Sequence, residues 1–203
     1  MESVNNIDKM LFASSLNGDL EGVVDALAQG GRVAVRNQGF TPLLLAAQNG
    51  HTDICGLLLA HGSDVNEVVR KTEMTALHKA AIRGHEAVVE ALLSWGAIVD
   101  PQNHLGATPL YAACQEGHLA CVLALLKAGA SISVPTNNGN LPITVAAVEN
   151  RVDIVRTLLD CGCSPDMVSC GDNTLTTIMT SSLLSAEQCG RFNTTHACSI
   201  KRI

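Results

Sequence analysis

Histidine is the residue of this chain whose number and spacing could most readily bind a metal or transfer protons. Three of the seven histidines, His51, His85 and His118, each follow a glycine, and successive members are 34 and 33 residues apart. The side chains of a metal or catalytic cluster must converge on one point, whereas these histidines recur once in every copy of a longer pattern. The recurrence indicates that they are neither ligands nor catalytic residues.

The cysteines include the one cluster of the sequence that resembles a zinc site. Cys161 and Cys163 are separated by a single residue, whereas structural zinc sites favour pairs separated by two. The other members are scattered further along the chain, at Cys170, Cys189, His196 and Cys198. We therefore predict no metal site, and we expect Cys55, Cys114 and Cys121 to be core residues of helices.

Motifs of the common enzyme classes are absent from the sequence. There is no GxxxxGK[ST] phosphate loop, no GxSxG nucleophile elbow and no GxGxxG dinucleotide motif. His85 and Glu86 begin like the zinc-protease motif HExxH, but Ala87, Val88 and Val89 follow them. We expect no catalytic residue and no cofactor, and hence a protein that is not an enzyme.

Composition and charge exclude other classes. The 203 residues suffice for about one domain, and 47% of them are apolar, which excludes a wholly disordered chain. Aromatic residues make up only 2%, which disfavours β-sandwiches and barrels. With 13 basic against 19 acidic residues, the net charge of −6 disfavours a general binder of nucleic acid or of anionic membranes.

The location of the protein is inferred from targeting signals that the sequence lacks. No stretch reaches the roughly 18 apolar residues of a membrane span. The first residues lack the basic and apolar regions of a signal peptide. We expect a monomer in the reducing cytoplasm, with the nucleus as the alternative, and free thiols at its cysteines.

A repeat supplies the elements that position these residues. Four copies begin at Thr41, Thr75, Thr108 and Leu141, at steps of 34, 33 and 33 residues. Each continues with paired alanines, a turn, a Leu-Leu pair and a glycine, as in TPLLLAAQNGHTDICGLLLAHG. A weaker copy begins at Met10, and a sixth opens at Ser169 and fades.

Each copy has the features of two short helices. Thr41 can cap the free N–H groups at a helix start, and Pro42 costs nothing at the first helical position. Cys55, Leu58 and Leu59 follow the spacing i, i+3, i+4, which gives the second helix one apolar stripe. A single pair cannot bury both helices, so neighbouring copies must stack.

Over about residues 7–168 the pattern resembles the ankyrin repeat family, because TPLxxAA, GH, VVxxLL and GA recur in this order. The resemblance implies an all-α repeat solenoid of stacked ankyrin helix–turn–helix units joined by β-hairpin loops. It also implies that the recurring histidines and His78 hydrogen-bond to neighbouring backbone. We expect residues 1–168 to form an ankyrin repeat domain of about five units, the first degenerate. Residues 169–203 are expected to form an incomplete repeat that acts as a cap, and a disordered tail.

The resemblance further implies a non-catalytic scaffold that binds a partner protein or peptide on the concave face, made by the hairpin tips and the first helix of each unit. Carried onto this sequence, the candidate partner-binding residues are Gln38, Phe40, Lys71, Met74, Lys79, Ile82, Arg83, His104, Leu105, Tyr111, Gln115 and Glu116. Apolar and basic side chains are mixed in this set. We therefore expect a partner with an acidic, partly apolar segment across units two to four. A merely solvated charged face is the alternative.

Two further expectations depend on the same resemblance. The alternative function is an adaptor or substrate-recognition subunit, in which residues 172–203 recruit other machinery such as a ubiquitin ligase. Asn66 follows Val65 in a hairpin, where an asparagine can resemble the substrates of an asparaginyl hydroxylase. An ordinary hydrogen-bonded residue is the alternative at Asn66.

Two departures from the pattern lie in the turns. Glu73 occupies the hairpin position where the other copies have a glycine, and its hairpin contains one extra residue. Asn150 and Arg151 replace the Gly-His pair of the turn in the fifth copy. Such irregular positions are where members of this family usually vary their binding surface, although drift would produce the same variation.

Overall fold

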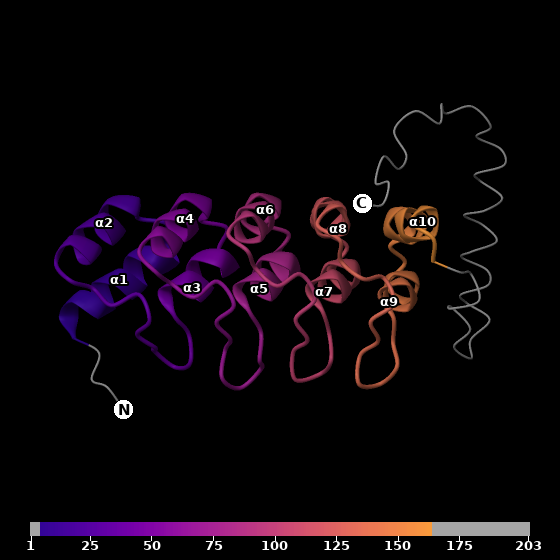
Figure 1. Cartoon of the computed structure of the whole chain (residues 1–203), viewed down its shortest axis with the longest axis horizontal. Coiled ribbons are helices and arrows are strands. Elements are labelled where there is room, and N and C mark those ends of the chain that lie inside the picture. Colours follow the sequence, from indigo (N-terminus) through magenta and orange to yellow (C-terminus); the bar gives the residue numbers. More distant parts are fainter. Residues whose placement is uncertain (1–4, 164–203) are drawn as a thin grey trace, which may run out of the picture.

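The computed structural model describes residues 5–163, which fold into ten α-helices arranged as five pairs. The first helices of the pairs are α1 (Asn6–Asn17), α3 (Pro42–Gln48), α5 (Ala76–Arg83), α7 (Pro109–Glu116) and α9 (Pro142–Val148). The second helices are α2 (Leu20–Ala28), α4 (Thr52–Ala60), α6 (Glu86–Ser94), α8 (Leu119–Lys127) and α10 (Val152–Asp160). The pairs stand in a row, with first and second helices in two layers and the hairpins projecting beyond the first helices (Figure 1). The predicted all-α repeat solenoid is confirmed.

Threonine caps begin α3, α5 and α7, as the sequence predicts, and Asn5 caps α1. The hydroxyl oxygen of Thr108 accepts the backbone N–H of Tyr111 at 3.2 Å, and Pro109 occupies the first helical position. Unit five differs, because Leu141 has no side-chain acceptor at the cap. There the hydroxyl of Thr144 accepts the backbone N–H of Leu141 at 2.8 Å instead. At the start of each first helix, a side chain therefore satisfies one N–H group that would otherwise lack a partner.

The recurring histidines join each unit to the one before it. Each ring donates from Nε2 to a backbone carbonyl at 3.1 Å: His51 to Leu16, His85 to Gln48, and His118 to Ile82. In unit five the guanidinium of Arg151 replaces the imidazole and donates to the carbonyl of Gln115 at 3.4 Å. The structural role predicted for these histidines is confirmed.

His78 has a second structural role that is also confirmed. Its ring is fully buried, contacts the cap Thr75 through Nδ1 and hydrogen-bonds from Nε2 to the carbonyl of Ala107 at 2.9 Å. Ala107 belongs to the hairpin of the next unit, so the ring ties one helix start to the following hairpin. Burial lowers the pKa of His78, which keeps the ring neutral.

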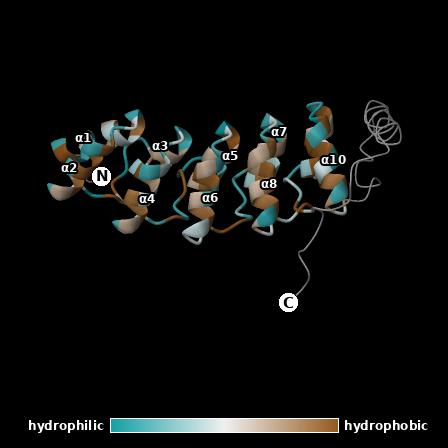
Figure 2. Ribbon diagram, turned by 90° about the horizontal axis from the view of Figure 1, so that it is seen from above, coloured by the Kyte–Doolittle hydropathy of each residue, from teal (hydrophilic) through white to brown (hydrophobic). Residues whose placement is uncertain are grey.

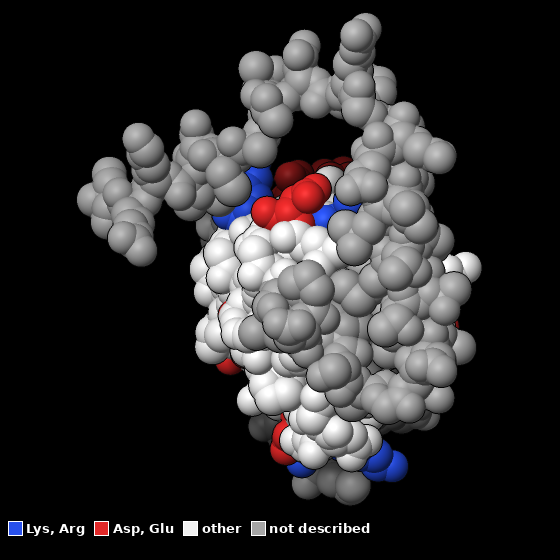
Figure 3. Space-filling model, turned by 90° about the vertical axis from the view of Figure 1, so that its right-hand side faces the viewer, with Lys and Arg blue, Asp and Glu red and all other residues white. Residues whose placement is uncertain are grey.

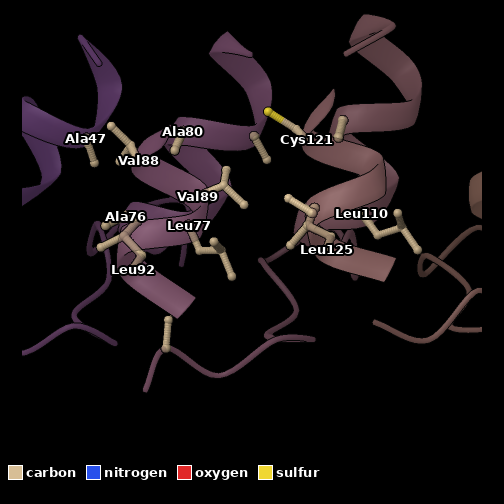
Figure 4. Packing of buried hydrophobic residues seen from close by; sticks show 14 of the residues in the cluster. Ala47, Ala76, Leu77, Ala80, Val88, Val89, Leu92, Leu110, Cys121 and Leu125 are labelled. Atoms are coloured by element: carbon tan, nitrogen blue, oxygen red, sulfur yellow. The ribbon is translucent and has the colours of Figure 1, made fainter. Parts of the chain in front are cut away.

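Stacking builds one continuous core from the apolar stripes of all five pairs. The paired alanines Ala46, Ala47, Ala80 and Ala81 are fully buried, which lets consecutive first helices lie close together. Leucine and valine side chains from both layers meet between neighbouring pairs (Figure 4). Seen from above, hydrophobic and hydrophilic residues alternate around the helices of both layers (Figure 2). Such two-sided helices are stable only within the stack.

The cysteines expected in the core are there. Cys55, Cys114 and Cys121 are fully buried. Burial raises the pKa of Cys55 and of Cys114 to about 12 and that of Cys121 to about 11. These thiols therefore stay protonated and act as small apolar side chains at neutral pH.

The hairpins contain isolated backbone bridges, and no strand occurs within residues 5–163. Asn37 and Phe40 exchange two backbone N–H···O bonds of 2.9 Å around Gln38 and Gly39. Both central residues have positive φ, 52° and 88°, as in a type I′ turn. Glu73 also has a positive φ of 54°, so it adopts the conformation of the glycine that it replaces.

The predicted boundary at residue 168, the cap and the tail at 169–203 lie outside the described residues and stay predictions. Among residues 5–163, the longest helix has 12 residues, and none is long and apolar enough to cross a membrane.

Candidate functional site

The hairpins and the outer side of the first helices form one surface, which we call the hairpin face. Hydrogen bonds between successive hairpins hold it together. Arg36 donates to the carbonyl of Val68 at 2.8 Å, and His104 donates from Nδ1 to that of Thr72 at 2.8 Å. The carbonyl of His104 in turn accepts a bond of 3.0 Å from the side chain of Asn137. The hairpins of units two to five therefore form a row whose members are fixed relative to one another.

A hollow of the hairpin face, which we call the first groove, lies between the hairpins of units two and three. It measures about 950 Å³. Its lining residues are Ala34, Val35, Arg36, Gln38, Gly39, Phe40, Val69, Arg70, Lys71, Thr72 and Lys79. Four of the predicted partner-binding residues meet here, namely Gln38, Phe40, Lys71 and Lys79. No acidic residue is among the described residues that line it.

Phe40 is the aromatic wall of the first groove, and its backbone is fixed on both sides. The bridge to Asn37 holds it at the end of the turn, and the next residue, Thr41, caps α3. The ammonium group of Lys79 lies 5.2 Å from the centre of the Phe40 ring, within range of a cation–π interaction. The groove thus presents a rigid ring beside a positive charge.

The cations of the first groove are not equivalent. Arg36 forms an ion pair with Glu67 and also donates to backbone, so its charge is already compensated. No ion pair links Arg70, Lys71 or Lys79 to any carboxylate among residues 5–163. Burial, followed by the nearby charge of Arg83, lowers the pKa of Lys79. An anion in this groove would offset the repulsion between the positive charges of Lys79 and Arg83.

A second groove of about 470 Å³ lies on the other side of the same hairpin. It is lined by Lys9, Phe12, Ala13, Leu16, Asn37, Gln38, Phe40, Leu45 and Gln48. Gln38 and Phe40 line both grooves, so the hairpin of unit two is the ridge between them. The second groove is mainly apolar, and its described lining residues include one basic and no acidic side chain.

The sequence did not lead us to the part of the second groove that α1 contributes. Leu16 occupies the same position in unit one, two residues before the turn glycine, as Gln48 in unit two and Ile82 in unit three. Counting that position back into the degenerate unit would have found it. The sequence marked Arg36 and Arg70 as part of a locally basic region, but neither was among the predicted partner-binding residues, and neither were Ala34, Val35, Gly39 and Val69, which also line the first groove.

The other predicted partner-binding residues lie away from both grooves. Met74 and Ile82 are half-buried, while Arg83, Gln115 and Glu116 are exposed. These five residues carry no contact that would distinguish a site from an ordinary surface, and their role stays a prediction.

Three of the candidates stand out by their contacts or exposure. The side chain of His104 is engaged with the neighbouring hairpin, as described above. Leu105 at the next position is 57% exposed. Tyr111 is half-buried, and burial raises its pKa despite a hydrogen bond with Asn140. Their part in partner binding likewise stays a prediction.

Asn66 makes the hydrogen bonds of a structural residue. Its Oδ1 accepts the backbone N–H of Ile98 in the next unit at 2.9 Å, and its own N–H donates to the side chain of Asp64. Asp100 makes the equivalent bond to Ser131 one unit later. Hydroxylation of Asn66 stays a prediction.

The candidate zinc cluster of the sequence lies only partly within the described residues. No group of three or more His, Cys, Asp or Glu side chains within residues 5–163 is placed to hold a metal ion. Of the candidate zinc cluster, only Cys161 and Cys163 fall in that range, and the others lie outside it.

Viewed along the row, charged side chains gather mainly at the edges carrying the second helices and the hairpins, and the visible flank between them is largely uncharged (Figure 3).

Comparison with known proteins identifies the repeat. A family model described as ankyrin repeats, in three copies, matches residues 10–103 and 96–169. Similar proteins include the ankyrin repeat and KH domain-containing protein mask-1 of Caenorhabditis elegans, 39% identical over 107 residues, and mouse diacylglycerol kinase iota, 32% identical over 109 residues. Each alignment covers 52% of this chain but only 4% and 10%, respectively, of the relative. The human ankyrin repeat and KH domain-containing protein 1 is 42% identical over 72 residues, which are 35% of this chain and 3% of that protein.

Proposed function

Because this chain belongs to the ankyrin repeat family, whose repeats are protein-interaction modules, we propose that it is a non-catalytic scaffold that binds a partner protein on its hairpin face. The partner segment is acidic and partly apolar, and it occupies the first groove. The activities of the larger relatives are not carried over, because the chain matches only small fractions of them.

One observation carries this proposal: the first groove combines a fixed aromatic wall with three cations that have no carboxylate partner among the described residues. Aromatic residues flanked by polar ones are typical of the centre of a protein interface. Unpaired positive charge attracts an acidic segment and rejects a basic one.

Charge reversal tests the proposal directly. The full chain would be used for affinity capture from a cell extract, beside the triple variant Lys71→Glu, Lys79→Glu and Arg83→Glu. All three residues are on the hairpin face, and Lys79 and Arg83 share one side of α5. We expect recovery of the captured partners to fall by about tenfold or more, because each reversed charge repels an acidic segment.

A matched control separates this effect from a general change in charge. Lys127 and Arg156 are exposed on α8 and α10, in the other helix layer. Reversing both should leave recovery unchanged, and circular dichroism should show that every variant folds. Equal capture by the triple variant and the intact chain would refute the proposed site.

The adaptor function considered from the sequence depends on residues 172–203, which lie outside the described residues. It stays a prediction. Co-purification of elongin- or cullin-type proteins that is lost on deletion of residues 172–203 would support it.

A further inference from the structure

The two grooves are neighbours that share a wall and differ in charge. Both have mainly apolar walls, but the first is flanked by Arg70, Lys71 and Lys79, whereas Lys9 is the one charged side chain among the described residues that line the second. Gln38 and Phe40 belong to both. From this arrangement we infer that the partner of the hairpin face is a bipartite linear segment, with acidic residues in the first groove and a large apolar residue in the second. This inference rests on the proposed function and specifies the partner that it requires.

The second groove fits the large apolar residue of the partner segment. Phe12, Leu16 and Leu45 bring their side chains to it from α1 and α3, and Phe40 closes it on the hairpin side. Leu16 is 46% exposed although leucine favours burial. A volume of about 470 Å³ lies within the range of about 300–1,000 Å³ that ligand pockets occupy. An apolar side chain placed there would bury area that is otherwise exposed to water.

The positive charge around the grooves fits the acidic residues of the partner segment. The described residues that line the two grooves carry five cationic side chains and no acidic one: Lys9, Arg36, Arg70, Lys71 and Lys79. Of these five cations, only Arg36 forms an ion pair with a carboxylate in the described part of the chain. An acidic segment therefore complements this surface, and a basic or neutral segment does not.

The ridge between the grooves sets the spacing of the motif. The hairpin of unit two turns through only Gln38 and Gly39 and has the width of two chain segments. Paired strands lie about 5 Å apart, and an extended chain advances about 3.3 Å per residue. The ridge is therefore about 5–10 Å wide, from the spacing of its two segments to their full width, and an extended segment that crosses it separates its apolar residue from its acidic residues by about two to three positions.

The inference is tested by selection from a random 12-residue peptide library displayed on phage, with the full 203-residue chain as bait. We expect the enriched peptides to carry a large apolar residue about two to three positions from two or more Asp or Glu residues. The selection is repeated with Ala13→Glu, which places a carboxylate in the second groove. Ala13 is exposed in α1 and Glu is a good helix former, so this variant should fold. Ala120→Glu, the same change at an exposed position of α8, is the control.

The affinity of the most enriched peptide, measured by fluorescence anisotropy, then distinguishes the contribution of its apolar residue from that of its acidic residues. Ala13→Glu should weaken binding by more than about tenfold, and replacing the apolar residue of the peptide by alanine should weaken it similarly. Combining both changes should cost little more than either alone, because they remove the same contact. Lys71→Glu with Lys79→Glu should weaken binding and also reduce its dependence on salt. Ala120→Glu should bind as the intact chain does.

The outcomes distinguish failure of this inference from failure of the proposed function. Enriched peptides that are acidic but lack an apolar preference, or binding unchanged by Ala13→Glu, would overturn the bipartite motif and leave the proposed function standing. Peptides without acidic residues, binding indifferent to Lys71→Glu with Lys79→Glu, or no enrichment at all would overturn both.

Discussion

At the scale of single residues, the glycines differ in what an added methyl group would meet. Gly56 lies in the middle of α4, and a Cβ built there has no atom within 4 Å. Gly22 in α2 is different, because a Cβ there would lie 2.2 Å from the carboxylate of Asp19 and 2.3 Å from the hydroxyl of Ser14. Asp19 caps α2 through the backbone N–H of Gly22. The same substitution therefore has opposite consequences at the two positions.

We expect Gly56→Ala to raise the free energy of unfolding by about 0.5–1 kcal/mol, since alanine loses less backbone entropy in a helix than glycine does. Gly22→Ala should give no gain or a loss, because the methyl group displaces the cap. Urea denaturation followed by circular dichroism measures both changes. An equal gain from the two substitutions would show that the contacts of Gly22 are unimportant.

The carboxylate of Asp8 is a buried charge with a partner. It is fully buried and pairs with Arg32 at 2.7 Å, while its other oxygen accepts the backbone N–H of Arg32 at 3.1 Å. Burial by itself raises the pKa of Asp8, but the bonds from Arg32 and Asn5 outweigh it, so the pKa is lowered. A lowered pKa means that the ionised group stabilises the fold.

The resulting prediction is a pH-dependent effect of Asp8→Asn. The contribution of Asp8 is complete above its pKa in the unfolded chain, about 4, and is lost as the pH falls through the lower value of the folded state. We expect Asp8→Asn to cost about 1–3 kcal/mol at pH 7. The difference from the intact protein should shrink below about pH 4. Urea titrations at pH 7, 5 and 3.5 would measure it, and a difference that is constant with pH would contradict the ionic role.

At the scale of elements, the turn glycine of one unit is coupled to the imidazole of the next. Gly84 ends α5 with φ of 76°, and a Cβ there would lie 2.6 Å from the ring of His118. Gly96 follows α6 with a similar φ of 82° but with open space around a Cβ. The two glycines therefore share the backbone requirement and differ only in the contact.

We expect Gly96→Ala to cost about 1–2 kcal/mol, the price of a left-handed conformation for an L-residue. Gly84→Ala should cost more, because the His118 ring must also move. In a His118→Ala background, Gly84→Ala should cost only about as much as Gly96→Ala does, because no ring is left to displace. Denaturant unfolding of the two glycine variants, of His118→Ala and of the double variant measures these differences, and equal losses at the two glycines in the intact background would mean that the close contact carries no energy.

At the scale of the whole molecule, stability depends on how many neighbours a unit has. Units two to four are packed between two others, whereas unit one has a described neighbour on only one side. In a stack of this kind each interface adds its own stabilisation, so the ends open first. We expect native-state hydrogen exchange to be slowest in α5 and α7 and faster in α1. Equal protection in these three helices would indicate that the stack unfolds as one unit.

The sequence by itself determined the helix pairs and their order. Caps such as Thr41 and Thr108, the buried alanine pairs and the turn glycines recur because every unit makes the same contacts with its neighbours. A periodic pattern of burial is visible in one dimension. The role of His51, His85 and His118 followed for the same reason.

The tertiary structure alone decided which exposed residues lie together around the two grooves. Counting repeat positions would have placed Leu16 on this face, but only the fold shows that Phe12 and Leu16 of α1 line one groove together with Phe40 of the hairpin of unit two. Likewise Arg36 is compensated by Glu67 whereas Lys71 and Lys79 have no such ion pair in the described part of the chain. Exposed side chains are free of the packing that makes core positions periodic, so their grouping depends on distances between units that only the folded stack sets.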